Sequence, residues 1–488
     1  MFYVSTRGNS EPVRSTRAVL DGIAHDGGLY MPEKMPTLDW KATLQLPVME
    51  MAEKILGCFL PDFEDMKGIV TRAYTGKFET EDLVPVVPVG ENYVLELFRG
   101  PTSAFKDVAL SALPQLMVAA RKQEGATDNV MILTATSGDT GKAALAGFQD
   151  VEGTGIMVFY PQDGVSAVQK AQMVTQEGSN VRVCAVKGNF DDAQTGVKEI
   201  FNEVEQKNLL EGSGVVLSSA NSINIGRLAP QVIYYFKAYA DLVKMGRIAV
   251  GDLVDFTVPT GNFGNILAGY LAKCLGLPVG RLICASNANN VLSDFIGTGC
   301  YDRRRTFHKT ASPSMDILVS SNLERLIYLL SGCDAAFVAE KMAQLKKDGI
   351  YQIPAELLQK VQETFWGDFC DDAETKETIG KVWKDHGYVC DTHTAVAFRV
   401  AEKYAAQGGE KRPNVILSTA SPYKFPASVV EGLGETPDAD EFAVMEQLEK
   451  LTGVPVPKNL QGLKEKTVRH TDLTAPADML DYVMNNVK

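Results

Sequence analysis

The sequence has few residues of the kinds that hold metal ions or covalent cross-links. Among 488 residues there are eight cysteines and five histidines, and no cysteines form a Cys-x-x-Cys pair. Zinc sites and disulfide frameworks depend on such clusters and spacings, so we expect neither, and no other metal site. The cysteines are interpreted as free thiols in a reducing compartment.

Long apolar runs are also missing. The longest uncharged stretch, residues 256–272, contains a proline, three glycines and two asparagines, which a membrane-spanning helix does not collect. The first residues, 1–13, include Arg7 and Glu11 and lack the apolar centre of a secretory signal. We therefore expect a cytoplasmic protein that is neither exported nor inserted in a membrane.

Basic residues are in the minority. Lysine and arginine number 48 against 61 acidic residues, which gives a net charge of −13. This balance disfavours binding along the phosphate backbone of a nucleic acid, so no such partner is expected. A small anion is not excluded, because it responds to the charges in its own pocket.

What the sequence does contain is an alternation of short β-rich runs with helix-length segments. The expected strands are 93–98, 129–134, 156–160, 181–186, 215–218, 254–259 and 282–286, and the expected helices 107–123, 142–149, 191–206, 227–243 and 265–274. Such alternation predicts an α/β fold with mainly parallel strands covered on both faces. Binding sites on these sheets lie beyond the carboxyl ends of the strands.

Two breaks in the pattern predict the domain organisation. Residues 83–90 include two prolines, so residues 1–85 are expected to form a small amino-terminal domain. After Tyr301 the alternation of strands and helices ends, and residues 301–405 are expected to form a mostly helical insertion. The α/β core would then comprise 86–300 and 406–488.

The first candidate catalytic motif is Arg-Gly-Pro-Thr-Ser-Ala-Phe-Lys-Asp at 99–107. A lone lysine is usually a surface cation, but Lys106 follows a Gly-Pro turn and the apolar Phe105, at an expected helix start. Partial burial and the positive end of the helix dipole would lower its pKa and give an amine able to form a Schiff base.

The second motif, residues 134–143, is a glycine-rich turn between strand and helix. It is not a nucleotide P-loop, because Thr136 and Ala143 occupy positions where that motif requires glycine and Ser or Thr. Its backbone amides, with the hydroxyls of Thr136, Ser137 and Thr140, suit a carboxylate or a phosphate.

Two further strand-to-helix junctions have similar character. The turn at 258–266, Val-Pro-Thr-Gly-Asn-Phe-Gly-Asn-Ile, allows the backbone to approach an anion closely. The junction at 218–227 includes Asn221, Asn224 and Arg227, and the arginine can bind a phosphate or a carboxylate with two parallel hydrogen bonds. Four such junctions predict one pocket for an anionic ligand and a second anion.

These motifs together resemble a known family. The segments 101–107, 136–141, 261–265 and Ser-Thr-Ala-Ser-Pro-Tyr-Lys-Phe at 418–425 are similar to pyridoxal-phosphate enzymes of the tryptophan-synthase-β fold. Together with 3–8 and 26–32, they resemble more narrowly the long bacterial and fungal form of the threonine synthase family, over nearly the whole chain. The resemblance implies two parallel-sheet α/β domains that sandwich the cofactor pyridoxal 5'-phosphate, as in fold type II enzymes.

The resemblance also implies roles for individual residues. Lys106 would bind the cofactor covalently, Thr419 would hydrogen-bond its pyridine nitrogen, and the cofactor phosphate would lie on Gly261, Asn262, Phe263, Gly264 and Asn265. The substrate phosphate would be bound by Asn221 and Arg227, with Ser137, Thr140 and Lys142 nearby. Asp139 would face the cofactor's phenolate oxygen; an ionised carboxylate would repel that oxygen, so we expect Asp139 to be protonated or turned aside.

The implied reaction converts O-phospho-L-homoserine and water to L-threonine and phosphate by β,γ-replacement. Two alternatives stay open: a phospho-lyase on the same fold that releases 2-oxobutyrate, and a non-catalytic cofactor-binding regulator. His393 is interpreted as a structural histidine behind the site rather than an acid or base. The sequence leaves open whether the protein is a monomer or a homodimer.

Overall fold

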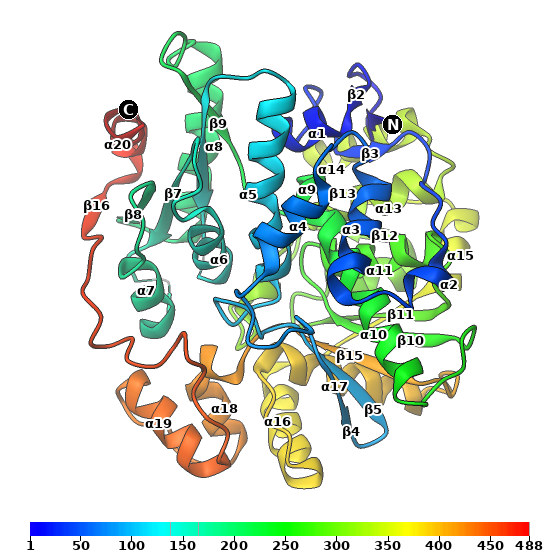
Figure 1. The fold of residues 1–488 in the computed structure, drawn as a ribbon. Coiled ribbons are helices and arrows are strands. Elements are labelled where there is room, and N and C mark those ends of the chain that lie inside the picture. Colours follow the sequence, from blue (N-terminus) through cyan, green and yellow to red (C-terminus); the bar gives the residue numbers. More distant parts are fainter. Residues whose placement is uncertain (137, 164, 488) are drawn as a thin grey trace.

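The computed structural model describes residues 1–136, 138–163 and 165–487, and two sheets dominate it (Figure 1). The larger sheet has the strand order β14-β11-β10-β15-β5-β4. Its strands are β4 (Val86–Val89), β5 (Asn92–Glu96), β10 (Val254–Pro259), β11 (Val279–Ser286), β14 (Phe365–Phe369) and β15 (Asn414–Ser418). Neighbours are parallel except the hairpin pair β4–β5.

The smaller sheet is parallel throughout, with the order β16-β8-β7-β6-β9. Its strands are β6 (Asn129–Ala135), β7 (Thr154–Pro161), β8 (Val181–Val186), β9 (Val215–Ser218) and β16 (Asp472–Thr474). The expected parallel α/β fold is confirmed. Figure 1 shows this sheet on the left, with the chain returning to it through the carboxyl-terminal segment.

Most expected helices form where the sequence places them: α5 (Lys106–Gln123), α6 (Asp139–Phe148), α8 (Phe190–Gln206) and α11 (Gly264–Cys274). The helix expected at 227–243 is interrupted. It consists of α9 (Ile225–Leu228), a 3₁₀ turn (Ala229–Gln231) and α10 (Val232–Lys244). Pro230 lies in that turn, and proline has no N–H for the helical ladder, which accounts for the break.

Helices α5 and α6 approach each other unusually closely. Pro114, inside α5, cannot donate to the carbonyl of Leu110 four residues earlier, so that oxygen has no helical partner at this position. Gly147 of α6 lies against it, and a Cβ built there would be 2.0 Å from the Leu110 oxygen. Only glycine fits this contact, which sets the distance between the helices that begin with Lys106 and Asp139.

The amino-terminal segment packs into the same core. It has a small antiparallel sheet, β1 (Phe2–Ser5), β2 (Val13–Arg14) and β3 (Tyr30–Pro32), and the helices α1 (Ser15–Asp21), α2 (Trp40–Thr43), α3 (Val48–Phe59) and α4 (Met66–Tyr74). The buried hydroxyl of Tyr74 donates to the carbonyl of Val108 in α5 at 3.0 Å. Arg7 makes a two-bond ion pair with Glu324.

The segment 301–405 is largely helical but contributes to the larger sheet as well. Besides α13 (Leu323–Leu330), α14 (Ala335–Asp348), α15 (Ala355–Thr364) and α16 (Asp372–His386), it contains the edge strand β14 and α17 (Thr392–Ala406), which packs on β10, β11 and β15. The domain boundaries at 85, 300 and 405 stay predictions.

The remaining elements are α7 (Ala167–Val174), α12 (Val291–Thr298), the strand pair β12 (Cys300–Asp302) and β13 (Ile350–Gln352), and the carboxyl-terminal helices α18 (Pro426–Gly432), α19 (Glu441–Thr452) and α20 (Met479–Asn486). Within the described ranges, no helix combines the length and apolar character required to cross a membrane.

Candidate active site

Most of the predicted site residues line one pocket of about 340 Å³. They are Lys106, Thr140, Asn221, Arg227, the turn Gly261–Asn265 and Thr419. They come from the starts of α5, α6, α9 and α11 and from the end of β15, which belong to segments up to 313 residues apart in the chain. The pocket therefore lies beyond the carboxyl ends of the parallel strands, as expected for this sheet type.

Lys106 is held at the pocket by the turn that precedes it. The Asp107 carboxylate accepts hydrogen bonds from the backbone N–H of Thr102, at 2.8 Å, and from its hydroxyl, at 2.5 Å. The N–H of Phe105 donates to the carbonyl of Thr419 at 2.8 Å. These contacts fasten the start of α5 to the end of β15, so Lys106 and Thr419 enter the same pocket.

The Lys106 amine is a better nucleophile than an exposed lysine. Burial lowers its pKa to about 8, and the positive charges of Arg227 and Lys424 act in the same direction. Asp139, whose Oδ2 lies 4.0 Å from Nζ, opposes this effect. A substantial share of the amine is therefore neutral at physiological pH, as covalent bonding to an aldehyde requires.

Asp139 lies behind Lys106 rather than in the pocket lining. Its Oδ1 is 3.0 Å from Nζ of Lys424, and both side chains are almost completely buried. Gln169 donates to Oδ1 at 3.1 Å and Ser314 to Oδ2 at 3.2 Å. Burial by itself would raise the pKa of Asp139, but Lys424 and Lys106 outweigh it and hold that pKa well below the ordinary value.

Of the two alternatives expected for Asp139, protonated or turned aside, the geometry favours the second, and its assignment to the cofactor stays a prediction. The carboxylate is turned toward Lys424, as one alternative required, but this geometry favours an ionised group and not a protonated one. The opposing charge of Lys424, absent from the sequence-based assignment, neutralises it.

Arg227 supplies a second cation to the pocket. Its guanidinium is buried, and Nη1 donates to the carbonyl of Ala220 at 2.6 Å. Nε is also buried and has no hydrogen-bond partner among the described residues. Burial lowers the pKa of Arg227 to about 10. A buried cation with an unused donor fits a bound anion. Asn221, which is exposed, lies at the rim of the same pocket.

The glycine-rich turn before α11 carries the features of a phosphate site. Phe263 has a φ of 62°, in the left-handed region that a bulky side chain rarely adopts. Its buried ring packs on Phe365 at a centroid distance of 5.6 Å, which holds the turn in place. The first N–H groups of α11 have no partner within the helix. The buried Nδ2 of Asn265 also has no partner among the described residues.

His393 lines the pocket but is occupied by protein partners. The Ser314 N–H donates to Nε2 at 3.1 Å, and Nδ1 lies 2.7 Å from the Asp391 carboxylate. Since Nε2 accepts, the ring proton is on Nδ1. His393 thus positions Ser314, whose hydroxyl donates to Asp139, in agreement with its interpretation as a structural residue.

Two predicted residues are not part of this arrangement. Ser137 lies outside the described residues. Lys142 does not line the pocket; its Nζ donates to Gln176 in a separate cavity. The predicted contact of Lys142 with the substrate phosphate thus finds no support in this geometry.

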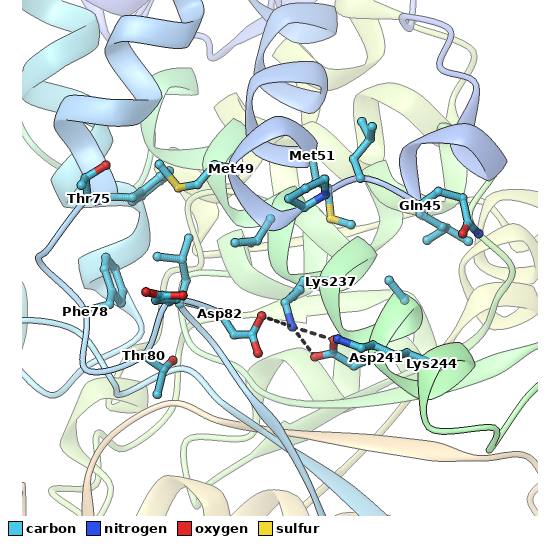
Figure 2. Close-up of a pocket in the computed structure, with 18 of the residues that line it drawn as sticks. Gln45, Met49, Met51, Thr75, Phe78, Thr80, Asp82, Lys237, Asp241 and Lys244 are labelled. Atoms are coloured by element: carbon cyan, nitrogen blue, oxygen red, sulfur yellow. Dashed lines mark hydrogen bonds and ion pairs between the residues drawn. The ribbon is translucent and has the colours of Figure 1, made fainter.

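A larger cavity, of about 1000 Å³, lies between the amino-terminal segment and α10. Figure 2 shows Lys237 there, directed at Asp82 and Asp241. Both oxygens of Asp241 accept from Lys237 at 2.6 Å, so the charges satisfy one another. None of the predicted site residues lines this cavity.

Sequence reasoning missed Lys424 and Ser314. Lys424 stands within the segment 418–425 that was recognised, and it is the one charged residue of that segment. Ser314 belongs to the segment after Tyr301, where no motif pointed to the site.

A buried lysine opposite a glycine-rich anion turn is typical of enzymes that use an aldehyde cofactor with a phosphate group. Models of three protein families match the chain in order: "Threonine synthase N terminus" at residues 2–74, "Pyridoxal-phosphate dependent enzyme" at 89–421 and "Threonine synthase, C-terminal" at 394–483. Because the second model spans more than half of the chain, the chain belongs to the family of pyridoxal-phosphate-dependent enzymes.

Individual relatives narrow this class. Threonine synthase from Pseudomonas aeruginosa is 39% identical over 465 residues, which cover 93% of this chain and 96% of that protein. The PLP-bound threonine synthase structure from Brucella melitensis is 37% identical and covers 99% of both chains, with a TM-score of 0.88. Threonine synthase-like 1 from Homo sapiens is 40% identical over 434 residues, 86% of this chain.

The chain belongs to the threonine synthase family, which confirms the resemblance found in the sequence. The aligned region covers 58% of the human threonine synthase-like 1 protein, so the chain spans less than two thirds of that relative.

Proposed function

We propose that the protein converts O-phospho-L-homoserine and water to L-threonine and phosphate, with pyridoxal 5'-phosphate as cofactor. The observation that supports this most is the presence of two buried cations in one pocket. Lys106 has a lowered pKa and lies at a helix start, and Arg227 has an unused donor. The Lys106 amine suits the cofactor aldehyde, and the Arg227 guanidinium suits the phosphate group that the reaction releases.

The described residues fit the cofactor. Lys106 would hold it covalently, the turn Gly261–Asn265 with the free Nδ2 of Asn265 would bind its phosphate, and Thr419 would meet its ring nitrogen. When bound, the cofactor supplies an electron sink that stabilises negative charge on the substrate carbons next to the amino group. Asp139 would influence the site through Lys106 and Lys424, since it is not in the pocket lining.

The remaining roles belong to the protein. Lys106, once released from the cofactor, is a base of suitable pKa to take the α proton from the substrate. Arg227, Asn221 and Thr140 would bind the γ-phosphate and keep it in place as its bond to carbon breaks. The assignments of Ser137 and Lys142 to the same phosphate stay predictions, as do cytoplasmic location and the choice between monomer and homodimer.

The test is to incubate the purified holoenzyme with O-phospho-L-homoserine and to quantify every product. We expect L-threonine and phosphate in equal amounts. A predominance of 2-oxobutyrate and ammonia would instead identify a phospho-lyase. Lys106→Ala should abolish turnover and the visible absorbance of the lysine-bound cofactor. Turnover by Lys106→Ala equal to that of the unaltered protein would contradict the assignment of Lys106.

A further inference from the structure

A cavity of about 580 Å³ lies next to the active site without sharing any of its lining residues. It is bounded by α6, by α7 and the residues that follow it, and by the segment 459–466 that leads toward the smaller sheet. The remaining side is formed by residues 76–77 after α4, by Pro101 and by Ser111 of α5. Its size is within the range of small-molecule sites. None of the roles proposed above uses it.

The lining of this cavity is basic. Lys77, Lys142 and Lys466 face it with a single carboxylate, Glu177, which is paired with Arg469 at 3.2 Å. Within residues 1–136, 138–163 and 165–487, no carboxylate lies in ion-pair distance of any of the three lysines. The Nζ of Lys142 has one protein partner there, the amide oxygen of Gln176.

The Lys142 amine has no counter-charge among the described residues, and its partner there is the neutral amide of Gln176. Burial lowers its pKa to about 7, and Lys424 and Lys466 add to this effect. The pKa falls because the ammonium form of a largely buried lysine, paired only with a neutral amide, is costly, and an anion bound beside it would stabilise that form.

A second observation also indicates a ligand. Gln172 is 1% exposed and lines the same cavity, and its Nε2 has no hydrogen-bond partner among the described residues. Its Oε1 is used, because it accepts from Nζ of Lys424 at 2.5 Å. The amide orientation is thereby fixed, which leaves Nε2 as a donor without a protein partner in the wall of the cavity.

We propose that this cavity binds a small polar molecule through an oxyanion group, a carboxylate or a phosphate, with Lys142 and Lys466 as its counter-charges and Gln172 as a donor. The amide side chains of Gln149 and Gln176 in the wall suit the polar remainder of such a molecule. For Lys142 this proposal is an alternative to the sequence-based assignment to the substrate phosphate.

The position of this site connects it with the active centre. Gln172 contacts Lys424, which pairs with Asp139, which in turn lies beside Lys106. Asp139 and Lys142 are also one turn apart on α6. Gln172 therefore belongs to a wall of the cavity and also contacts the ion pair behind Lys106.

The first test is crystallographic and uses the holoenzyme soaked in selenate, a tetrahedral dianion with an anomalous signal. We expect a selenium peak between Lys142 and Lys466. Lys466→Gln, a change at an exposed position, should remove it, while a peak at Arg227 serves as the internal comparison. A peak at Arg227 alone would overturn the proposal.

The second test measures Lys142 in solution. The holoenzyme is acetylated with limiting acetic anhydride in phosphate, acetate or chloride at equal ionic strength, and each lysine is quantified by peptide mass spectrometry. Phosphate or acetate should slow acetylation of Lys142 at least about 5-fold and leave the exposed Lys207 unchanged, and Lys466→Gln should reduce the protection. Stronger protection by phosphate or by acetate identifies the group. Equal rates in all three salts would refute the site.

Discussion

The contribution of the buried ion pair between Lys424 and Asp139 to the free energy of unfolding can be tested quantitatively. Nζ and Oδ1 are 3.0 Å apart, and the two side chains are 0% and 3% exposed. Asp139→Asn keeps the shape of the side chain but removes its charge, so Lys424 becomes an unpaired cation. Removing one partner of a buried pair typically costs about 3–5 kcal/mol, whereas replacing both partners is often close to neutral.

We therefore expect Asp139→Asn and Lys424→Met each to lower the free energy of unfolding by about 3–5 kcal/mol, and the double variant to lose no more than either alone. The coupling free energy should be at least about 2 kcal/mol. Urea titration of the cofactor-free protein at pH 7 measures all four proteins. Asp139 is ionised there, because its pKa in the folded protein is below the ordinary 3.8.

The lowered pKa of Asp139 also determines how the stability of the folded protein depends on pH. A carboxylate whose pKa is lowered on folding contributes stability above its unfolded pKa and loses it as the pH falls through its folded pKa. The contribution of the Asp139 carboxylate to the difference between the unaltered protein and Asp139→Asn should thus be complete above about pH 5 and be lost only in strong acid. The difference should also fall as the pH rises toward about 8, because Lys106, which Asp139 helps to keep protonated, loses its charge there. Additive costs of the two single substitutions, or a cost below about 1 kcal/mol for Asp139→Asn, would refute the reasoning.

Three further predictions concern the pocket and its supports. The rate at which the cofactor-free protein takes up pyridoxal phosphate, followed by absorbance, should rise with pH around a midpoint of about 8, because only the neutral Lys106 amine reacts; Asp139→Asn should move the midpoint lower, and a midpoint near 10.5 would contradict the lowered pKa. Gly147→Ala should destabilise the protein by about 1–3 kcal/mol in urea titration, because its Cβ would strike a backbone carbonyl of α5. The control Gly57→Ala, with no atom within 4 Å, should be neutral or stabilising. Arg227→Gln should raise KM for the phosphorylated substrate far more than the Kd of the cofactor; the opposite pattern would reassign Arg227 to the cofactor phosphate.

Local chemistry made much of the site predictable from the sequence. A strand, a turn of small and polar residues and the start of a helix can be recognised from about ten consecutive residues. The parallel topology then brings such junctions to the same end of a sheet. Lys106, Arg227 and Gly261–Asn265 were found in this way. The interruption at Pro230 was visible by the same local rule, but the helix expected at 227–243 runs across it.

The parts that escaped prediction depend on contacts distant in sequence. Lys424 is separated from Asp139 by 285 positions, and no pattern near either residue specifies the other. The direction of the Lys142 side chain likewise depends on contacts that are distant in sequence. Its place one turn after Asp139 agrees with a role in the pocket, but the packing of α7 puts Gln176 beside it and gives its amine a different cavity.

The sign of the local charge differs from that of the whole chain. The net charge is −13, yet the described interior around the site gathers Lys106, Arg227, Lys424 and Lys142, and Asp139 is the carboxylate that contacts two of them. Burial lowers the pKa of Lys106, Lys142 and Arg227, which means that the charged form of each group costs free energy in the folded protein. A ligand with a phosphate group relieves part of that cost only in the folded state. Cofactor binding should consequently stabilise the protein by mass action, and an acidic chain can bind two phosphates because each meets a local excess of positive charge.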